Sequence, residues 1–311
     1  MSEDAGARLW TAAFRRMIAP ARARPGLGRL IAGFLMVEAL FFGGAVLLLG
    51  LTADLLFAPG PSVTDPESWG YRSTPLGVVL VLLTPAFLFV WVRWVAGRLQ
   101  GRRMGDLIGA FDPRLLGGAA AITLGLALVG EILIWTDPLL PNLPLGTLLA
   151  WMPLALPVLL LQAGGEELFY RGYLQTQLAA RFEDPVIWLG GPALLFGLAH
   201  VDVWHLVMTG AFRGNDGGWL IVLVSSGLIA GDLTRVTGGI AAAWGWHFGN
   251  NIFAVFVVTF DGPVSGLSLY LLPFTADEVP LGALVLAQLL ASQVILWALL
   301  RLWLARRGLP G

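Results

Sequence analysis

The chain is organised around Gly164-Gly165-Glu166-Glu167-Leu168-Phe169-Tyr170-Arg171-Gly172, a polar stretch at the end of a long apolar run. Glu167 and Arg171 stand at positions i and i+4 of a helix, so their charges share one face and predict an ion pair. Glu166 points to a different face. One carboxylate is therefore expected to have a partner within its own helix, which leaves the other free to act on a group outside it.

The composition is that of an integral membrane protein. Of the 311 residues, 57% are hydrophobic and 13% are charged, which is too apolar for a water-soluble domain of this length. The chain has no cysteine, which excludes disulfides, cysteine-ligated metals and thiol nucleophiles. All 19 basic residues are arginine, so lysine-based mechanisms are excluded as well. A net charge of -1 gives no reason to expect a nucleic-acid partner.

Eight apolar runs are each long enough to cross a bilayer, which takes about 20 residues. We therefore predict an all-α polytopic membrane bundle with about eight transmembrane helices, without repeats or a separate soluble domain. The runs cover residues 30–51, 76–97, 115–136, 145–165, 190–211, 217–233, 239–260 and 281–304.

The chain divides into an N-terminal tail and one membrane domain. Residues 1–29 are rich in arginine, and their apolar residues recur at helical spacing, which predicts an amphipathic helix on the membrane surface. Residues 30–311 are expected to form the membrane domain, with the motif-bearing core at about 145–260. The first apolar run is too long for a signal-peptide core, so we expect it to be a retained span.

Arginine is distributed unevenly between the two predicted sides of the membrane. Six arginines lie in the N-terminal tail, and the second loop holds Arg93, Arg98, Arg102, Arg103 and Arg114. If eight spans alternate, these and most other arginines share one side, and an excess of arginine marks the cytoplasmic side. The expected location is the cell (inner or plasma) membrane, with several passes through the lipid bilayer and both termini in the cytoplasm.

Few other ionisable side chains interrupt the apolar runs. Such groups cost about 2.5–3.5 kcal/mol each at the centre of a membrane, so they usually face a bundle interior or a wet cavity. The candidates among them are His200, His247, Glu38 and Glu131. His247 and Asn251 are at i and i+4, which places imidazole and carboxamide on one helical face. Three helices are thus expected to bring carboxylate, imidazole and amide groups together in the inner half of the membrane.

Three motifs occur in order on successive predicted helices. They are Glu-Glu-x-x-x-Arg at 166–171, Phe-x-x-x-His at 196–200 and His-x-x-x-Asn at 247–251. This arrangement resembles the CPBP family of CAAX-type and bacteriocin-processing (ABI-type) intramembrane proteases, over about residues 145–260. The resemblance implies hydrolysis of a peptide bond at or within the membrane, in a membrane-bound or lipidated peptide or protein substrate.

The resemblance also implies roles for the motif residues. Glu166 would be the base that activates a water, and His200 would polarise the same water. His247 and Asn251 would hold the developing oxyanion, because an imidazole and an amide are good donors. The neighbouring Glu167 and its ion-pair partner, Arg171, would brace the helix.

No cofactor is expected, although the family has also been described as metalloproteases. If a divalent metal such as zinc were present, Glu166, His200 and His247 would be its ligands. The sequence has no His-Glu-x-x-His helix, and this residue set differs from the common zinc shells. We therefore favour activation of water by glutamate without a metal.

Structural interpretations stay open for several residues. His205 lies five residues after the second motif and is expected to have a structural or interfacial role. Glu38 and Glu131 have no partner nearby in the sequence, so interhelical hydrogen bonds are the default for both. The pair Gly164-Gly165 permits either a bend or close helix packing.

A second function is compatible with the same polar residues. The chain would then be a non-catalytic membrane protein, either an immunity or scaffold factor or a transporter with a polar cavity. Discontinuous helices or repeat symmetry would favour the transporter. Replacement of Glu166 by Gln separates the two functions, because only a protease would lose its activity.

Overall fold

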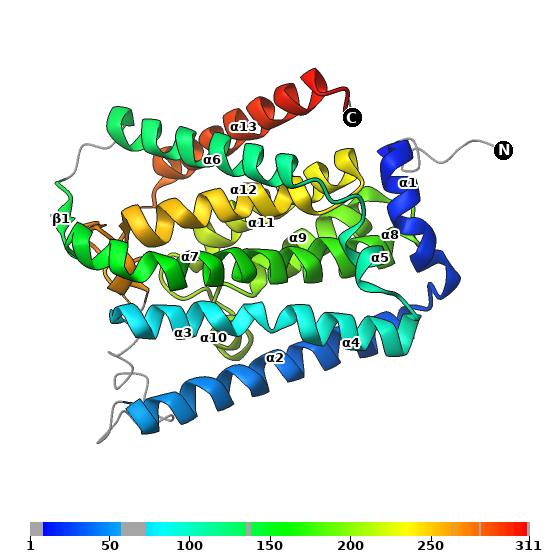
Figure 1. Ribbon diagram of the computed structural model, residues 1–311, viewed down its shortest axis with the longest axis horizontal. Coiled ribbons are helices and arrows are strands. Elements are labelled where there is room, and N and C mark those ends of the chain that lie inside the picture. Colours follow the sequence, from blue (N-terminus) through cyan, green and yellow to red (C-terminus); the bar gives the residue numbers. More distant parts are fainter. Residues whose placement is uncertain (1–8, 57–72, 135–137, 263, 280, 310–311) are drawn as a thin grey trace.

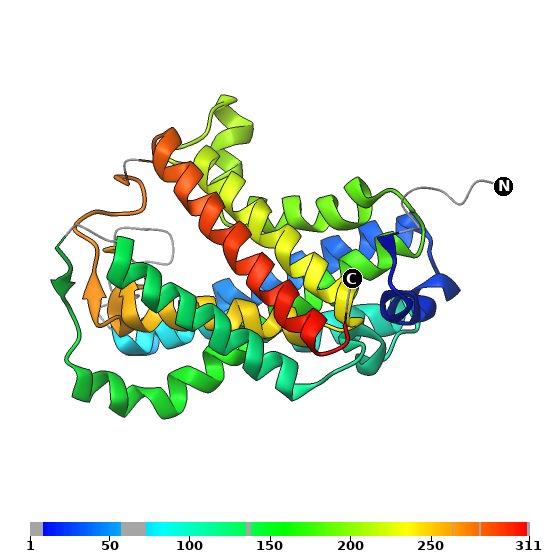
Figure 2. The same cartoon turned by 90° about the horizontal axis from the view of Figure 1, so that it is seen from above.

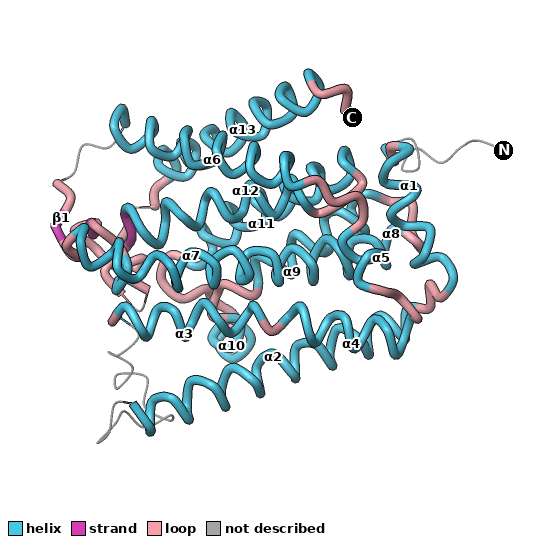
Figure 3. Tube along the Cα trace, viewed as in Figure 1, coloured by secondary structure: helices cyan, strands magenta, loops and turns pink. Residues whose placement is uncertain are grey.

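The computed structural model describes residues 9–56, 73–134, 138–262, 264–279 and 281–309. Within these ranges the chain is almost entirely helical, which confirms the predicted all-α bundle (Figures 1 and 3). The α-helices are α1 (Ala12–Ile18), α2 (Leu27–Leu56), α3 (Pro75–Ala86), α4 (Leu88–Gln100), α5 (Met104–Ile108), α6 (Pro113–Ile134), α7 (Leu145–Glu167), α8 (Thr176–Ala179), α9 (Gly191–Leu198), α10 (Val203–Thr209), α11 (Asp216–Thr237), α12 (Ala241–Ile252) and α13 (Ala283–Arg306).

Short 3-10 and π-helical segments continue or connect these helices. They are η2 (Ala19–Ala23), η4 (Leu168–Gln175), η5 (Val186–Gly190), η6 (Phe253–Val257) and η7 (Ser265–Leu267). Of these, η4, η5 and η6 are π-helical. The polar motif at 166–171 therefore spans the junction between α7 and a π-helix.

A small three-stranded sheet closes the end of the bundle where α7 begins (Figure 3). Its strands are β1 (Leu140–Pro141), β2 (Val258–Thr259) and β3 (Tyr270–Leu271). The central strand β3 pairs antiparallel with β1 and parallel with β2. Asn142 donates its side-chain N–H groups to the carbonyls of Ser265 and Ser268 at 2.8 and 2.9 Å, so the loop before α7 is tied to the chain that follows η6.

Six segments of the described chain are long and apolar enough to cross a membrane, and the bent pair α9–α10 makes up to seven. The six are Leu27–Thr52, Pro75–Gln100, Pro113–Gly130, Leu145–Ala179, Asp216–Thr237 and Ala283–Arg306. The chain is therefore a multi-pass membrane protein, with six or seven candidate spans where about eight were predicted.

Three of the predicted runs differ in detail from the structure. The run at 190–211 is not one helix, because Val186–Leu198 and Val203–Thr209 meet at a 90° bend. The run at 239–260 is helical only through α12 and η6. The run expected to end at residue 165 continues as helix to Ala179, because the residues of η4 are all buried in the bundle, where protein contacts replace water.

The helix ends that lie near the arginine-rich loops gather at one end of the bundle. The backbone N–H of Ile240 donates to the Ile108 carbonyl at 3.0 Å, and that of Ala110 donates to the Gly238 carbonyl at 2.9 Å. These bonds join α5 to the turn between α11 and α12. Helix α1 and the last turn of α13 also lie at this end of the molecule (Figure 1). That this end of the bundle faces the cytoplasm stays a prediction.

The helix predicted in the N-terminal tail is α1, which crosses this end of the bundle. Phe14 and Ile18 are fully buried, and the Phe14 ring centroid lies 5.3 Å from that of Trp188. Thr11 donates its hydroxyl to the Arg235 carbonyl at 2.6 Å. The apolar face of α1 thus contacts the protein, and its position at the membrane surface stays a prediction.

Large apolar side chains are exposed along the outer helices. On α2 and α13 they are Ile31, Leu35, Phe42, Val46, Leu47, Leu51, Leu284, Val294, Ile295, Leu299 and Leu302. Figure 2 shows α13 lying along the outside of the bundle. In a membrane protein, such surfaces face lipid tails.

Helix α12 packs closely against α6 through two glycines one turn apart. A Cβ atom at Gly245 would overlap the Leu116 carbonyl oxygen, and one at Gly249 would overlap the Ala120 carbonyl oxygen. Small residues at this spacing let membrane helices approach, because lipid provides no hydrophobic force between them. The two glycines flank His247 and therefore fix its height and direction.

The glycine pair before the carboxylates also serves close packing. A Cβ atom at Gly164 would overlap the Trp244 indole, and one at Gly165 would overlap the Pro85 carbonyl oxygen. The indole N–H of Trp244 donates to the Leu160 carbonyl at 2.8 Å. Of the two alternatives for this pair, the structure thus supports close packing of α7 against α12 and α3.

We predict opposite effects of the same substitution at two helical glycines. Gly245→Ala should lower the apparent Tm in detergent, by the equivalent of about 1–3 kcal/mol, because the new methyl meets backbone that cannot rotate away. Gly125→Ala, where nothing lies within 4 Å, should keep or slightly raise the Tm because alanine favours helix. Equal Tm values for both variants would contradict this account of the α6–α12 contact.

Candidate active site

A buried ion pair joins the second glutamate of the first motif to its arginine. Arg171 Nη1 lies 3.3 Å from Glu167 Oε1, with side chains 1% and 0% exposed, which is the predicted i,i+4 pair. Arg171 Nη2 also donates to the Gly227 carbonyl at 3.2 Å, and its guanidinium carbon lies 4.8 Å from the Phe196 ring centroid. One cation therefore connects the motif to α9 and α11.

The same carboxylate orients the imidazole of the third motif. His247 Nδ1 lies 2.9 Å from Glu167 Oε1, and both side chains are buried. A carboxylate paired with Arg171 accepts hydrogen bonds, so Nδ1 is the protonated nitrogen and donates. Glu167 thus does more than brace its helix, because it fixes which nitrogen of His247 faces the rest of the site.

A chain of amide hydrogen bonds runs beside this group. Asn251 Nδ2 donates to Gln162 Oε1 at 2.8 Å, and Gln162 Nε2 donates to Glu166 Oε1 at 2.6 Å. His247 and Asn251 therefore share one face of α12, as predicted from their spacing. The sequence analysis missed Gln162, although an amide in an apolar run, one turn before Glu166, was a signal that could have identified it.

The second oxygens of both carboxylates, Glu166 Oε2 and Glu167 Oε2, lack a hydrogen bond to any described residue, and the one on Glu166 faces the second ring nitrogen of His247. Glu166 Oε2 is buried and makes no hydrogen bond within the described residues. It lies 3.8 Å from His247 Nε2, which is too long for a direct hydrogen bond. Two acceptors at this separation are both within reach of a single bridging donor.

The second motif lies at the break between α9 and α10. His200 follows the end of α9, its ring is exposed, and its Nδ1 lies 2.7 Å from the Phe196 carbonyl. Nδ1 must therefore be the donor, and Nε2 is the nitrogen available to other groups. The Phe196 ring lies between the two histidines, with its centroid 4.7 Å from that of His200 and 5.9 Å from that of His247. Phe196 was read as part of the motif, but its contact with both imidazoles could not be foreseen.

Three other ionisable residues of the apolar runs belong to helices that carry none of the motifs. His205 is in the first turn of α10, beyond the bend, where its backbone N–H donates to Asp202 Oδ1 at 2.9 Å. Glu38 is half-buried in the middle of α2. Glu131 belongs to α6, and its side chain lies outside the described residues.

The arrangement does not form a metal site of the common kind, which needs at least three protein ligands. In the described part of the chain, no group of three or more histidine, aspartate and glutamate side chains is placed to hold a metal ion. Glu166 and His247 face each other, but His200 is held at the end of α9. The set of Glu166, His200 and His247 therefore does not fit zinc in this geometry, and the expectation that no cofactor is needed stays a prediction.

Fold and site together define a multi-pass membrane protein with a buried cluster of carboxylate, imidazole and amide groups. Residues 147–253 match the family model described as type II CAAX prenyl endopeptidase Rce1-like. The match contains all three motifs and confirms the resemblance to the CPBP intramembrane proteases. It supports intramembrane endopeptidase activity in general. Comparisons with curated proteins and with solved structures gave no match.

We predict that the ion pair of Glu167 and Arg171 behaves as a unit. Glu167→Gln should destabilise the protein by about 3–5 kcal/mol, because it leaves the buried guanidinium without its counter-charge. The double variant Glu167→Gln/Arg171→Met should recover much of this loss, because it removes both buried charges. Thermal unfolding in detergent measures both effects, and losses that simply add would contradict the prediction.

Proposed function

We propose that this protein is an intramembrane endopeptidase that hydrolyses peptide bonds with a water activated by Glu166. The observation that carries this proposal is the free Glu166 Oε2, which is buried and faces His247 Nε2 at 3.8 Å. A buried carboxylate oxygen without a donor is costly unless it has a use. One water can donate to both atoms, and its oxygen is then directed at a peptide carbonyl.

The reaction follows from this placement. Glu166 takes a proton from the water as its oxygen attacks the carbonyl carbon, and the carbonyl becomes an oxyanion. The C–N bond then breaks, and the proton passes to the leaving nitrogen, which yields a carboxylate and an amine. General base catalysis of this kind contributes about 10²–10⁴-fold to the rate.

The role of His247 is set by Glu167. With Nδ1–H directed at Glu167, the neutral imidazole presents an unprotonated Nε2 to the reacting groups. If Glu166 passes the proton of the water to Nε2 before it reaches the leaving nitrogen, His247 becomes a charged donor to the oxyanion, and Glu167 stabilises the imidazolium as the aspartate of a serine-protease triad does. His247 is thus an oxyanion donor in its protonated form, a refinement of the role that the resemblance implied.

The remaining groups complete the site. Asn251 is one turn from His247, and the second hydrogen of its amide nitrogen can meet the oxyanion, while the first bonds Gln162. Gln162 keeps Glu166 Oε1 occupied, so Oε2 is the oxygen that acts as base. His200 would contact the water through Nε2, which requires its exposed ring to approach Glu166 when substrate binds.

The depth of the site indicates how substrates would reach it. His247 lies six residues after Ala241, where α12 begins, which corresponds to about 9 Å along the helix. The site is therefore close to the arginine-rich end, which we place at the cytoplasmic face of the cell membrane. Membrane-anchored or lipidated peptides, whose cleavable bond stays near the surface, fit this depth. A prenylated substrate is included because the matching family is described by that activity.

One observation favours the transporter alternative. The α9–α10 pair is discontinuous, bent by 90° next to His200, and broken helices of this kind form substrate sites in transporters. The site itself favours the protease, because its polar atoms are organised around one carboxylate oxygen. The two functions differ in whether Glu166 must act as a base.

We predict that Glu166→Gln reduces proteolysis by at least about 10²-fold without loss of abundance or Tm, because the amide cannot accept the proton. The matched control is Glu38→Gln, the same change in another apolar run, which should keep wild-type activity. Proteomics of membrane fractions should find new peptide termini with the wild type and the control only. A fully functional Glu166→Gln protein would instead establish a non-catalytic role.

The two histidines at the α9–α10 break should respond differently to substitution. His200→Ala should lower the cleavage rate by about 10²-fold, because the water loses a polarising group, whereas His205→Ala should leave the rate unchanged. Cleavage of a lipidated reporter peptide by purified protein measures both rates. Equal rates for His200→Ala and wild type would remove His200 from the mechanism and leave Glu166 in place.

A further inference from the structure

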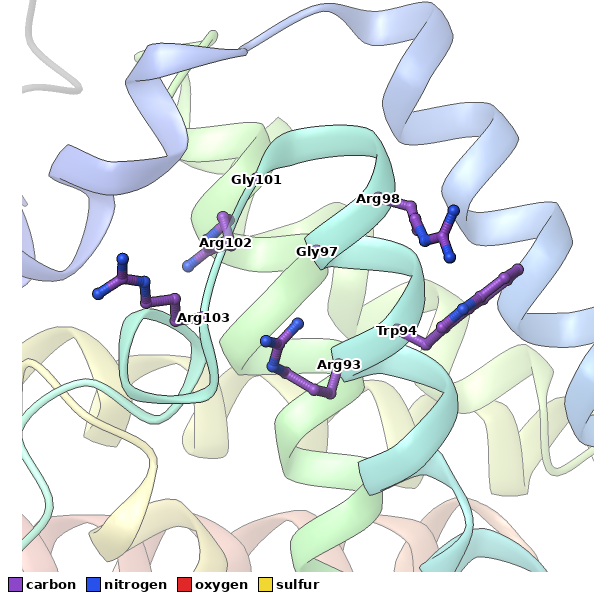
Figure 4. A pocket seen from close by; sticks show the side chains of 7 residues that line it. All are labelled: Arg93, Trp94, Gly97, Arg98, Gly101, Arg102 and Arg103. Atoms are coloured by element: carbon purple, nitrogen blue, oxygen red, sulfur yellow. The ribbon is translucent and has the colours of Figure 1, made fainter.

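A cavity of about 340 Å³ lies at the arginine-rich end, between α4 and the loop into α5 (Figure 4). Its lining includes Arg93, Arg98, Arg102 and Arg103, with Trp94 beside them. In Figure 4, Arg93 extends towards the loop with Arg102 and Arg103, whereas Arg98 and Trp94 point to the other side of α4, towards α2. This cavity is separate from the polar cluster around Glu166.

The positive charge of this pocket is not neutralised by the described residues. None of its four arginines forms an ion pair with a carboxylate there. Asp106 is the nearest compensation, but its Oδ2 accepts the backbone N–H of Arg103 at 2.7 Å. Like charges held this close repel one another, so an anion bound among them would stabilise the fold.

Arg102 shows that the site is built into the fold. Its side chain is 1% exposed, and it donates to Thr176 Oγ1 at 2.8 Å and to the Asp106 carbonyl at 2.6 Å. Its Nε is buried and has no acceptor among the described residues. Burial lowers the pKa of Arg102 to about 10, which still leaves it charged at neutral pH.

Gly97 makes room for the second arginine. A Cβ atom at this position would overlap Arg93 Nη1, so the guanidinium of Arg93 lies directly over the bare backbone. The Arg102 carbonyl is 3.6 Å from the same point, which places Arg93 beside the buried arginine. The guanidinium of Arg93 is thus held beside the backbone of Arg102, at the start of the loop into α5.

The pocket lies at the end of a membrane span and continues into an apolar surface. The span Pro75–Gln100 ends at the pocket, and Trp94 and Val90 are 45% and 55% exposed along α4. A tryptophan at such a level is typical of the membrane interface. An anion that binds here thus has room for hydrocarbon beside it, which favours a lipid over a free ion.

We propose that this pocket binds the phosphate-bearing headgroup of an anionic phospholipid, with Arg93 and Arg103 on the phosphate, the buried Arg102 beneath them, and an acyl chain that passes around α4 to the apolar side of Trp94 and Val90. Guanidinium groups pair with phosphate oxygens in bidentate geometry, and basic pockets between helices at the cytoplasmic end suit such headgroups. The bound lipid would fix the α4–α5 loop, which Arg102 connects to η4 and α8 through Thr176.

The test measures phosphatidylglycerol retained by the purified full-length protein, by native mass spectrometry, and the Tm gained on its addition. Arg93→Gln/Arg103→Gln should weaken binding by about fivefold for each arginine removed and should abolish the Tm gain. Arg306→Gln/Arg307→Gln removes the same charge at the end of α13 and should bind like the wild type. Arg102 is left intact in both, so the buried contacts persist.

A second pair of variants keeps all charges. Gly97→Ala displaces Arg93 and should weaken binding, whereas Gly105→Ala, with nothing within 4 Å, should not. Phosphatidylglycerol that binds equally to Arg93→Gln/Arg103→Gln and wild type would overturn the proposal. So would inorganic phosphate that reproduces the Tm gain, since the site would then be for a free anion. A third result would also overturn the proposal: Arg93→Gln/Arg103→Gln that binds lipid like the wild type but cleaves peptide more slowly. The pocket would then bind peptide.

Discussion

The charge of Arg171, buried inside a membrane protein, is the constraint on which the rest of the structure depends. A single charge in a low-dielectric interior costs several kcal/mol unless it is paired and hydrogen-bonded. Glu167 supplies the counter-charge, the Gly227 carbonyl supplies an acceptor, and His247 donates to the same carboxylate oxygen, Oε1. These contacts come from η4, α7, α11 and α12, so one electrostatic requirement fixes the relative positions of the helices that form the site.

Close backbone contact is the second requirement, and glycine meets it. The carboxylates reach His247 only because Gly164 and Gly165 let α7 approach its neighbours, and because Gly245 and Gly249 let α12 lie against α6. In lipid, helices gain little from burying apolar side chains against each other, so interhelical hydrogen bonds and close packing provide the attraction. Large apolar side chains also cover the outer faces of α2 and α13, where lipid surrounds them.

The local features of the site could be predicted from the sequence, whereas the long-range ones could not. The i,i+4 spacing correctly predicted the Glu167–Arg171 pair and the shared face of His247 and Asn251. Hydropathy cannot detect the break after His200, because α9 and α10 are both apolar and the bend depends on local backbone hydrogen bonds. Hydropathy also predicted that the fourth span ends at residue 165, because it treats polar residues as exposed to water. In the structure, protein contacts bury these residues. The partnership of Glu167 with His247 joins residues 80 positions apart, so no local pattern reports it.

The two adjacent carboxylates differ in what surrounds them, and this difference supports the separate roles that we propose for them. Glu167 Oε1 is shared by a guanidinium and an imidazole, so its charge is already used to hold the structure. Glu166 receives one amide hydrogen bond on Oε1, and its Oε2 stays open towards His247. A carboxylate paired with a guanidinium and an N–H donor is a poor base, whereas Glu166, whose Oε2 lies beside the unprotonated Nε2 of His247, suits the role of proton acceptor that we propose. The two residues are chemically identical, so their positions on the helix alone decide which one holds the structure and which one lies beside His247 Nε2.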